Sequence, residues 1–269
     1  MSIITISRDS FSHGKEIAEK VAGNLGYDCI GPEIIQYAAE SADLSYSELQ
    51  KALHDSPSFF DHIVAKREKR LALFRTAFFE YMCRDNIVYH GLAGHIFLAE
   101  VPNVIRVRVL ADFEDRIGEE MQRKHIGYDE AKKRLLQEDK EREKWTRSLY
   151  GIDNHDPGIY DLSLNLHNIS IKKAVNIIVG TAQVSMNGNR DSMLKRLKDM
   201  ALAAKTEAKL LEVFSEVEAV AREGEVFVSV RGSILQEKTI MEKAKRIVSE
   251  IDGVKLARIG VSSSEYVPF

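Results

Sequence analysis

The first 25 residues combine a short apolar run, a polar loop and an amphipathic segment. Residues 3–6 are apolar or β-branched throughout, which favours a buried strand. From residue 15 onward apolar positions recur at helical spacing as far as Gly26, and they fall on one face: Ile17, Ala18, Val21, Ala22 and Leu25. The pattern therefore predicts a strand, a polar loop over residues 7–16 and a helix.

Strand and helix patterns then alternate along the chain as far as residue 184. The sequence predicts strands over residues 27–30, 87–89, 104–110 and 162–166. It predicts helices from Pro32 through residue 38, over 45–58 with an interruption, and over 62–83, 114–124, 129–147 and 171–184. Strands separated by helices indicate an α/β fold with a parallel sheet covered by helices on both faces.

A polar break over residues 186–192 marks the expected domain boundary. Beyond it a helix over residues 195–208 is expected to continue or restart toward Glu223, followed by a strand over 226–230. A helix through residues 240–251 and a strand over 254–261 complete a small α+β unit. The predicted domains are residues 1–186 and 187–269.

The composition narrows the functional classes. A formal net charge of −3 gives no overall field that would attract nucleic acid or an anionic membrane. No apolar run approaches the roughly 20 residues of a membrane helix, and no signal-peptide pattern opens the chain. The two cysteines, Cys29 and Cys83, lack metal-ligand spacing. We therefore expect a cytoplasmic protein that is not integral to a membrane.

The loop over residues 7–16 lies where a phosphate-binding loop belongs, between a buried strand and a helix N-terminus. Such a terminus favours an anion, and Arg8 and Lys15 supply nearby cations. Against the GxxxxGK[ST] pattern, Gly14 and Lys15 match, whereas Asp9 replaces the first glycine and Glu16 replaces the Ser/Thr. The position of the loop argues for phosphate more strongly than its residues do.

Several segments resemble the cytidylate kinase-like family, whose first loop has the form Ser-Arg-x-x-Gly-Ser-Gly-Gly before a Glu-Ile-Ala helix start. The matching residues here are Ser7, Arg8, Ser12, Gly14, Glu16, Ile17 and Ala18. The resemblance continues through residues 88–94, 102–107, 160–162 and Asn165, and through Arg116, Met121, Arg123, Ala131, Asp139 and Arg142. It covers about residues 1–184 and implies a P-loop nucleotide-kinase fold.

The resemblance also implies an activity and a set of roles. The chain would transfer a phosphoryl group from ATP, with Mg²⁺, to a nucleoside monophosphate such as CMP or dCMP. Lys15, Arg142 and Arg123 would be catalytic. Gly91, Asp139 and Arg147 would bind the acceptor, and the nucleotide would contact Arg8, Ser12, His13, Gly14, Lys15 and Glu16. On composition alone, residues 129–147 equally suit a solvated helix with i,i+4 ion pairs.

Departures from the family pattern leave a second interpretation open. Leu92 stands where the family has an arginine, and Phe11 and His13 replace small residues or glycine in the phosphate loop. Glu16 either ligates magnesium or faces solvent. A nucleotide-binding sensor with weak turnover is the alternative to an active kinase. The run of polar residues 153–156 is more typical of a turn than of a metal site, and no metal ligands are assigned.

The C-terminal segment resembles a BON domain, whose strand-turn has the form Val-x-Val-x-Gly-x-Val. The matching residues are Val228, Val230, Gly232, Ile234, Ala244, Gly253 and Val254. The resemblance implies a module that binds a small ligand or lipid, or regulates the kinase. A packing or homodimerisation unit explains the same residues.

Overall fold

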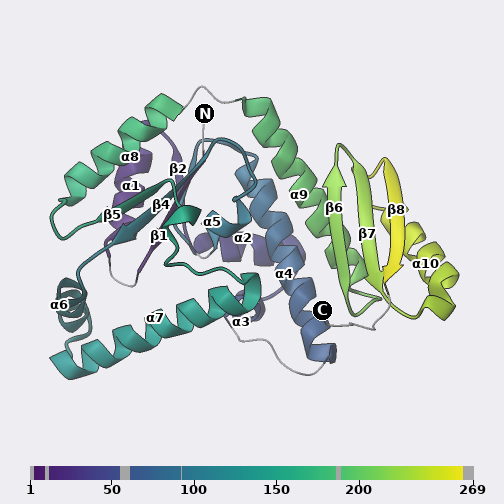
Figure 1. Cartoon of the computed structure of the whole chain (residues 1–269), viewed down its shortest axis with the longest axis horizontal. Coiled ribbons are helices and arrows are strands. Elements are labelled where there is room, and N and C mark those ends of the chain that lie inside the picture. Colours follow the sequence, from purple (N-terminus) through teal and green to yellow (C-terminus); the bar gives the residue numbers. More distant parts are fainter. Residues whose placement is uncertain (1–2, 10–11, 55–60, 92, 186–188, 263–269) are drawn as a thin grey trace. The chain divides into compact units, whose positions relative to one another are not determined.

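The computed structural model describes residues 3–9, 12–54, 61–91, 93–185 and 189–262 (Figure 1). Its contacts form two compact units. The first unit comprises Met1–Glu33 and Arg84–Arg190, and the second comprises Ile34–Cys83 and Asp191–Phe269. Each unit groups residues by spatial contact and combines two separate stretches of the chain. The expected domains, residues 1–186 and 187–269, are continuous stretches, so the expected boundary stays a prediction.

A parallel sheet of five strands organises the first unit, as the sequence predicted (Figure 1). The strand order is β2-β3-β1-β4-β5. All four pairings in the sheet are parallel. The strands are β1 (Ile3–Arg8), β2 (Asp28–Ile30), β3 (Ile87–Tyr89), β4 (Val104–Leu110) and β5 (Leu162–Asn165). The central position of β1 explains its apolar run, because both of its faces are covered.

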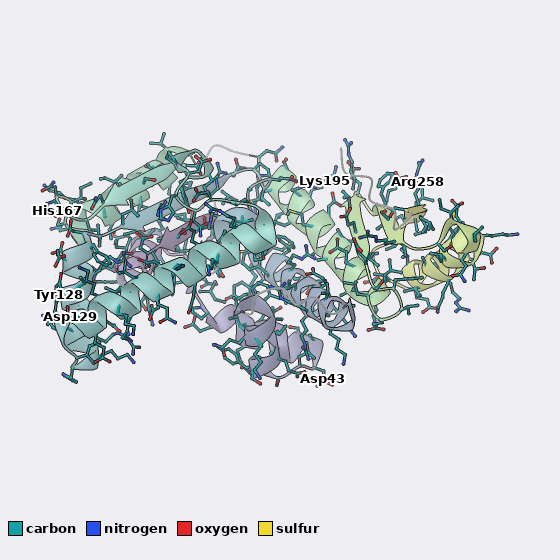
Figure 2. The ribbon with its side chains drawn as sticks, turned by 60° about the horizontal axis from the view of Figure 1, so that its bottom comes forward. Asp43, Tyr128, Asp129, His167, Lys195 and Arg258 are labelled. Carbon is teal, nitrogen blue, oxygen red and sulfur yellow. The ribbon has the colours of Figure 1, made fainter. Side chains whose placement is uncertain are left out.

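Helices cover this sheet and extend beyond its edge. The apolar face of α1 (Gly14–Leu25) and that of α8 (Ile171–Ser185) pack on β1 and β4 in one core. The short α5 (Gly94–Phe97) lies against β1. A hairpin of α6 (Phe113–Lys124) and α7 (Tyr128–Tyr150) has an apolar centre of its own. Figure 2 labels Tyr128 and Asp129 at the start of α7. Two parallel strands at the centre of the sheet, β1 and β4, continue at their carboxyl ends into the loops that precede α1 and α6.

The second unit contains helices from two parts of the chain and a small sheet. Its helices are α2 (Glu33–Ala42), α3 (Tyr46–His54), α4 (Asp61–Met82), α9 (Arg190–Leu210) and α10 (Glu237–Ser249). Its strands are β6 (Val217–Arg222), β7 (Glu225–Arg231) and β8 (Leu256–Ser262), in the order β6-β7-β8. Side chains of α9 and α10 share a core with this sheet. The expected small α+β unit is therefore present.

The expected helical continuation toward Glu223 is wrong, because β6 occupies residues 217–222. Apolar side chains alternate along β6 with a period of two, and Val217, Ala219 and Ala221 pair with alternate valines of β7. Glu223 and Gly224 both have positive φ, which suits a two-residue hairpin turn. A strand of small and β-branched residues was thus mistaken for the end of a helix.

Candidate active site

Arg8, the last residue of β1, packs against the first turn of α1. A Cβ added at Gly14 would lie 2.5 Å from Cδ of Arg8, so glycine is needed where the arginine crosses the helix start. His13 precedes the helix with φ 53°, and its side chain makes no capping hydrogen bond to the first turn. An uncapped helix N-terminus carries a partial positive charge that favours an anion. The expected strand and helix are therefore present, and anion binding by the loop between them stays a prediction.

Arg142 reaches the same place from α7. Its Nη1 donates a hydrogen bond of 2.6 Å to the carbonyl oxygen of Arg8. Burial and the neighbouring Arg142 charge lower the pKa of the Arg8 guanidinium. Among the described residues, no carboxylate lies within 4.0 Å of either guanidinium. Two adjacent cations without an acidic partner form a site that an anion would stabilise.

The two arginines line a cleft of about 500 Å³ together with much of the predicted phosphate loop. Three glutamates also line it: Glu19, Glu119 and Glu138. The predicted residues that the structure brings together here are Arg8, Ser12, His13, Gly14, Lys15, Glu16 and Arg142. The cleft therefore joins the phosphate loop to one arginine of the charged hairpin.

Lys15 and Glu16 make only surface ion pairs. Nζ of Lys15 lies 3.7 Å from a carboxylate oxygen of Glu19, and 60% of the lysine side chain is exposed. Such a pair is worth roughly 0.3–0.5 kcal/mol, so a phosphate would readily replace it. The carboxylate of Glu16 accepts a 2.6 Å hydrogen bond from Lys20, which lowers its pKa. His13 lies 3.5 Å from the same carboxylate.

Asp9 forms a hydrogen-bonded ion pair with a buried arginine of β4. Its carboxylate lies 3.3 Å from Nη2 of Arg108, whose residue is only 7% exposed. Ser12 is fully buried, and its hydroxyl lies 2.9 Å from the Asp9 carbonyl oxygen and 3.2 Å from the Val109 carbonyl oxygen. Both side chains hold the phosphate loop against β4. Phe11, a predicted departure from the family pattern, lies outside the described residues.

The other predicted residues of α6 and α7 do not line the cleft. Arg123 donates hydrogen bonds of 2.9 and 2.7 Å to the fully buried carboxylate of Glu120. Asp139 accepts two hydrogen bonds from the buried Arg116, at 2.8 and 2.7 Å. Arg147 pairs with Glu143 and Asp153 near the end of α7. Arg147 and Glu143 form one of the i,i+4 ion pairs expected in α7, whereas Arg142 of the same helix faces the phosphate loop.

Gly91 and Gly94 make room for the buried ring of Tyr89. A Cβ at Gly91 would lie 2.2 Å from the Tyr89 hydroxyl oxygen, and one at Gly94 would lie 2.3 Å from Cδ1. Packing within the first unit thus explains both glycines, whereas the acceptor-binding role of Gly91 stays a prediction. Leu92, which replaces the family arginine, lies outside the described residues.

Two histidines near the sheet are buried and have lowered pKa values. The pKa of His95 is lowered to about 4, mainly by burial; a hydrogen bond with Asn154 opposes this shift, and the charges of Arg108 and Arg106 add to it. His90 is also buried, and burial followed by the Arg8 charge lowers its pKa. Its Nδ1 has no hydrogen-bond partner within the part of the chain that the structure describes.

The loop over residues 153–156 forms turns, as the sequence suggested. Asp153 accepts the His155 amide, and Asp156 accepts the amide of Gly158. Among the described residues, no group of three or more His, Cys, Asp and Glu side chains is arranged to hold a metal ion. None of the described helices has the length and apolar character needed to cross a membrane.

Arg108 contacts Asp9, and Thr146 and Asn154 are joined by a hydrogen bond one turn after Arg142; none of the three was among the predicted site residues. Arg106 and Arg108 are two apart on an otherwise apolar strand, a signal that both charges lie on one face and need partners. Their partners, Asp161 and Asp9, are distant in sequence, so spacing alone gave no pairing. Thr146 and Asn154 carried no distinguishing signal.

Comparison with known proteins supports the resemblance to the cytidylate kinase-like family. Residues 3–168 match the model of a family described as cytidylate kinase-like. A cytidylate kinase of Saccharolobus islandicus is 27% identical over 180 residues, covering 66% of this chain and 88% of that protein. A cytidylate kinase of Staphylothermus marinus is 30% identical over 147 residues, covering 54% of this chain and 75% of that protein.

A solved structure of an uncharacterised protein from Eubacterium ventriosum shares the fold, with a TM-score of 0.52 and 17% identity. It covers 68% of this chain and 98% of its own. The family match ends at residue 168. The BON-like character of the C-terminal segment therefore stays a prediction, although its order of α9, β6, β7, α10 and β8 is now established.

Replacing Gly14 by Ala should weaken binding of inorganic triphosphate at least about tenfold, or 1.4 kcal/mol. The new Cβ would displace the Arg8 side chain from the helix start. Gly23→Ala is the matched control, because it lies in the same helix and its Cβ would meet nothing within 4 Å. Calorimetric titration measures the difference. Equal affinities for the two variants would contradict the assigned role of Arg8.

Stability should fall as the pH decreases from 6.5 to about 4. The unfolded chain protonates His95 near its ordinary pKa, whereas the folded protein does so only near pH 4. Above pH 6.5 the stabilisation is fully present. His95→Gln should reduce the slope of unfolding free energy by about 1.4 kcal/mol per pH unit in this window.

Urea unfolding at several pH values measures this slope. His167→Gln, at an exposed position labelled in Figure 2, controls for the loss of one imidazole. An unchanged slope in His95→Gln would contradict the assignment.

Proposed function

Since the chain belongs to the cytidylate kinase-like family, we propose that it transfers a phosphoryl group from ATP to a nucleoside monophosphate, CMP or dCMP. One observation carries the proposal. Arg8 and Arg142 line one cleft at the N-terminus of α1, and among the described residues no carboxylate lies within 4.0 Å of either guanidinium. A polyphosphate supplies the negative charge that this arrangement needs.

Phosphoryl transfer requires positioning and charge stabilisation more than covalent chemistry by the protein. Arg8 and the start of α1 would bind the donor phosphates. Lys15 would also bind these phosphates after breaking its ion pair with Glu19. Arg142 would stabilise the transferring group, because a planar guanidinium can donate to two phosphate oxygens at once. The positions of these three cations around one cleft support these roles.

Arg123 would reach the reacting phosphates only after leaving Glu120. The buried Glu120 carboxylate also accepts a 3.2 Å hydrogen bond from Arg134, so losing Arg123 would not leave it without a cation. This second partner makes the exchange less costly and supports Arg123 as a mobile catalytic arginine. Asp139 and Arg147 would meet the acceptor through a similar exchange of their present ion pairs.

Magnesium fits this cleft chemically, because the ion prefers oxygen ligands and commonly shares phosphate with one or two carboxylates. Glu16 and Glu138 line the cleft and would hold it with the phosphates. When bound, the ion would neutralise part of the phosphate charge. Glu16 would first have to release Lys20.

That requirement favours one alternative, a nucleotide-binding sensor with weak turnover. Both carboxylates that depart from the GxxxxGK[ST] pattern are engaged within the protein, Glu16 with Lys20 and Asp9 with Arg108. A phosphate-binding loop fixed in this way can hold ATP without organising transfer. In either case we propose a regulatory or ligand-binding role for the C-terminal segment from α9 to β8. The hydrophobic core of this segment supports the proposal. Homodimerisation and a cytoplasmic location stay predictions.

A coupled assay with ATP, Mg²⁺ and CMP or dCMP tests the kinase proposal. Lys15→Ala and Arg142→Ala should each lower kcat by about 100-fold or more, because each removes a cation from the transferring phosphates. Lys140→Ala removes an exposed cation two residues from Arg142 and should change kcat less than about twofold.

The same proteins are also titrated with ATP. Background turnover that is equal in wild type and Lys15→Ala, together with ATP binding by wild type, would reject the kinase and favour the sensor. Absence of ATP binding by wild type would reject both.

A further inference from the structure

A ring of hydrogen bonds connects Arg142 to the phosphate loop by a second route. The hydroxyl of Thr146 donates 2.9 Å to the carbonyl oxygen of Arg142, one turn earlier in α7. The side-chain amide of Asn154 donates 2.7 Å to the same hydroxyl. Arg108 donates to the carbonyl oxygen of Asn154 and, at 3.3 Å, to the carboxylate of Asp9.

The ring closes through the contact already described, in which Arg142 donates to the carbonyl oxygen of Arg8. The backbone before the phosphate loop is thus joined to α7 twice. One connection is direct, and the other passes through Arg108, Asn154 and Thr146. The direct contact holds the Arg142 side chain, and the second connection holds the backbone that carries it, so the side chain has little freedom to leave the cleft.

Burial makes this connection rigid. Thr146 is 1% exposed and Arg108 is 7% exposed. The guanidinium of Arg108 lies over the Tyr160 ring, 5.6 Å from its centroid, and also contacts Nδ1 of His155 at 3.2 Å. The Tyr160 hydroxyl donates 3.1 Å to the carbonyl oxygen of Asn154. A buried arginine held by this many partners resists displacement, because any lost partner leaves desolvated charge.

We propose that Thr146, Asn154 and Arg108 are positioning residues that hold Arg142 over the phosphate cleft. None of the three lines the cleft, and they act through the backbone of α7 and through Asp9. The identity of the bound anion rests on the proposed function, whereas the connection itself rests on the hydrogen bonds. The loop that follows α7 and carries Asn154 therefore contributes to phosphate affinity.

Thr146→Val tests the proposal, because it preserves shape and removes the hydroxyl that joins Asn154 to α7. The dissociation constant for inorganic triphosphate should rise about tenfold, as expected for a hydrogen bond that serves a charged group. Thr206→Val is the matched control, since Thr206 is fully buried and its hydroxyl donates 2.8 Å to the carbonyl four residues earlier in α9. Thr146→Ser should restore affinity to within about twofold of wild type.

A double-mutant cycle separates positioning from loss of stability. Asn154→Ala should weaken triphosphate binding as much as Thr146→Val, and the double variant should show no further loss, since both break one connection. Thermal unfolding of all variants is measured alongside. Additive losses, or equal losses in Thr146→Val and Thr206→Val, would overturn the proposal.

Two readouts distinguish this inference from the proposed function. If wild type binds triphosphate with the predicted pattern among variants but phosphorylates neither CMP nor dCMP, the positioning role stands and the kinase proposal fails. If wild type transfers phosphate and Thr146→Val binds and reacts normally, the kinase stands and the positioning role fails. If wild type binds no triphosphate, the positioning role is overturned, whereas ATP binding and turnover decide the kinase proposal.

Discussion

The hydrogen bond from Arg142 to the carbonyl oxygen of Arg8 places two cations at the carboxyl end of the central strand. This placement is unfavourable in isolation, because burial and like charge both disfavour the protonated state of Arg8. Surrounding contacts hold the two arginines in this arrangement. Gly14 gives the Arg8 side chain its path, and Thr146 fixes the turn of α7 that carries Arg142. An arrangement that costs stability without an anion gains it when phosphate binds.

The hairpin of α6 and α7 determines which arginines face the cleft. Its charged residues are not interchangeable, because two pairs with buried members fix the register of the helices. Arg116 of α6 is held by Asp139 of α7, and Glu120 of α6 is held by Arg134 of α7. These pairs point the remaining side chains in set directions, so Arg142 meets β1 while Arg123 does not. In this conformation Arg142 reaches the phosphate loop and Arg123 does not, and the catalytic roles of both stay predictions.

Much of the fold followed from local patterns in the sequence. The apolar run of β1, the helical spacing of α1 and the Gly26 terminus are short-range features, and the structure contains each of them. The expected continuation toward Glu223 failed because small residues such as Ala219 and Ala221 suit either a helix or a buried strand. Only pairing with β7 distinguishes the two.

The site was less accessible to prediction, because its contacts join distant segments. Asp9 and Arg108 are 99 positions apart, and Arg142 lies 134 positions from the carbonyl it contacts. The acceptor-binding role that the resemblance implies for Gly91 stays a prediction, and the ring of Tyr89 explains its missing side chain. A loop at the start of a helix can be recognised from sequence. The buried partner of each charge depends on the whole first unit.

A crystal structure of the protein with Mg²⁺ and a non-hydrolysable ATP analogue tests the central claim most directly. The account predicts β- or γ-phosphate oxygens about 3 Å from the guanidinium groups of both Arg8 and Arg142, and within the same distance of a backbone amide at the start of α1. An analogue whose phosphates lie outside the cleft, with neither arginine in contact, would contradict it.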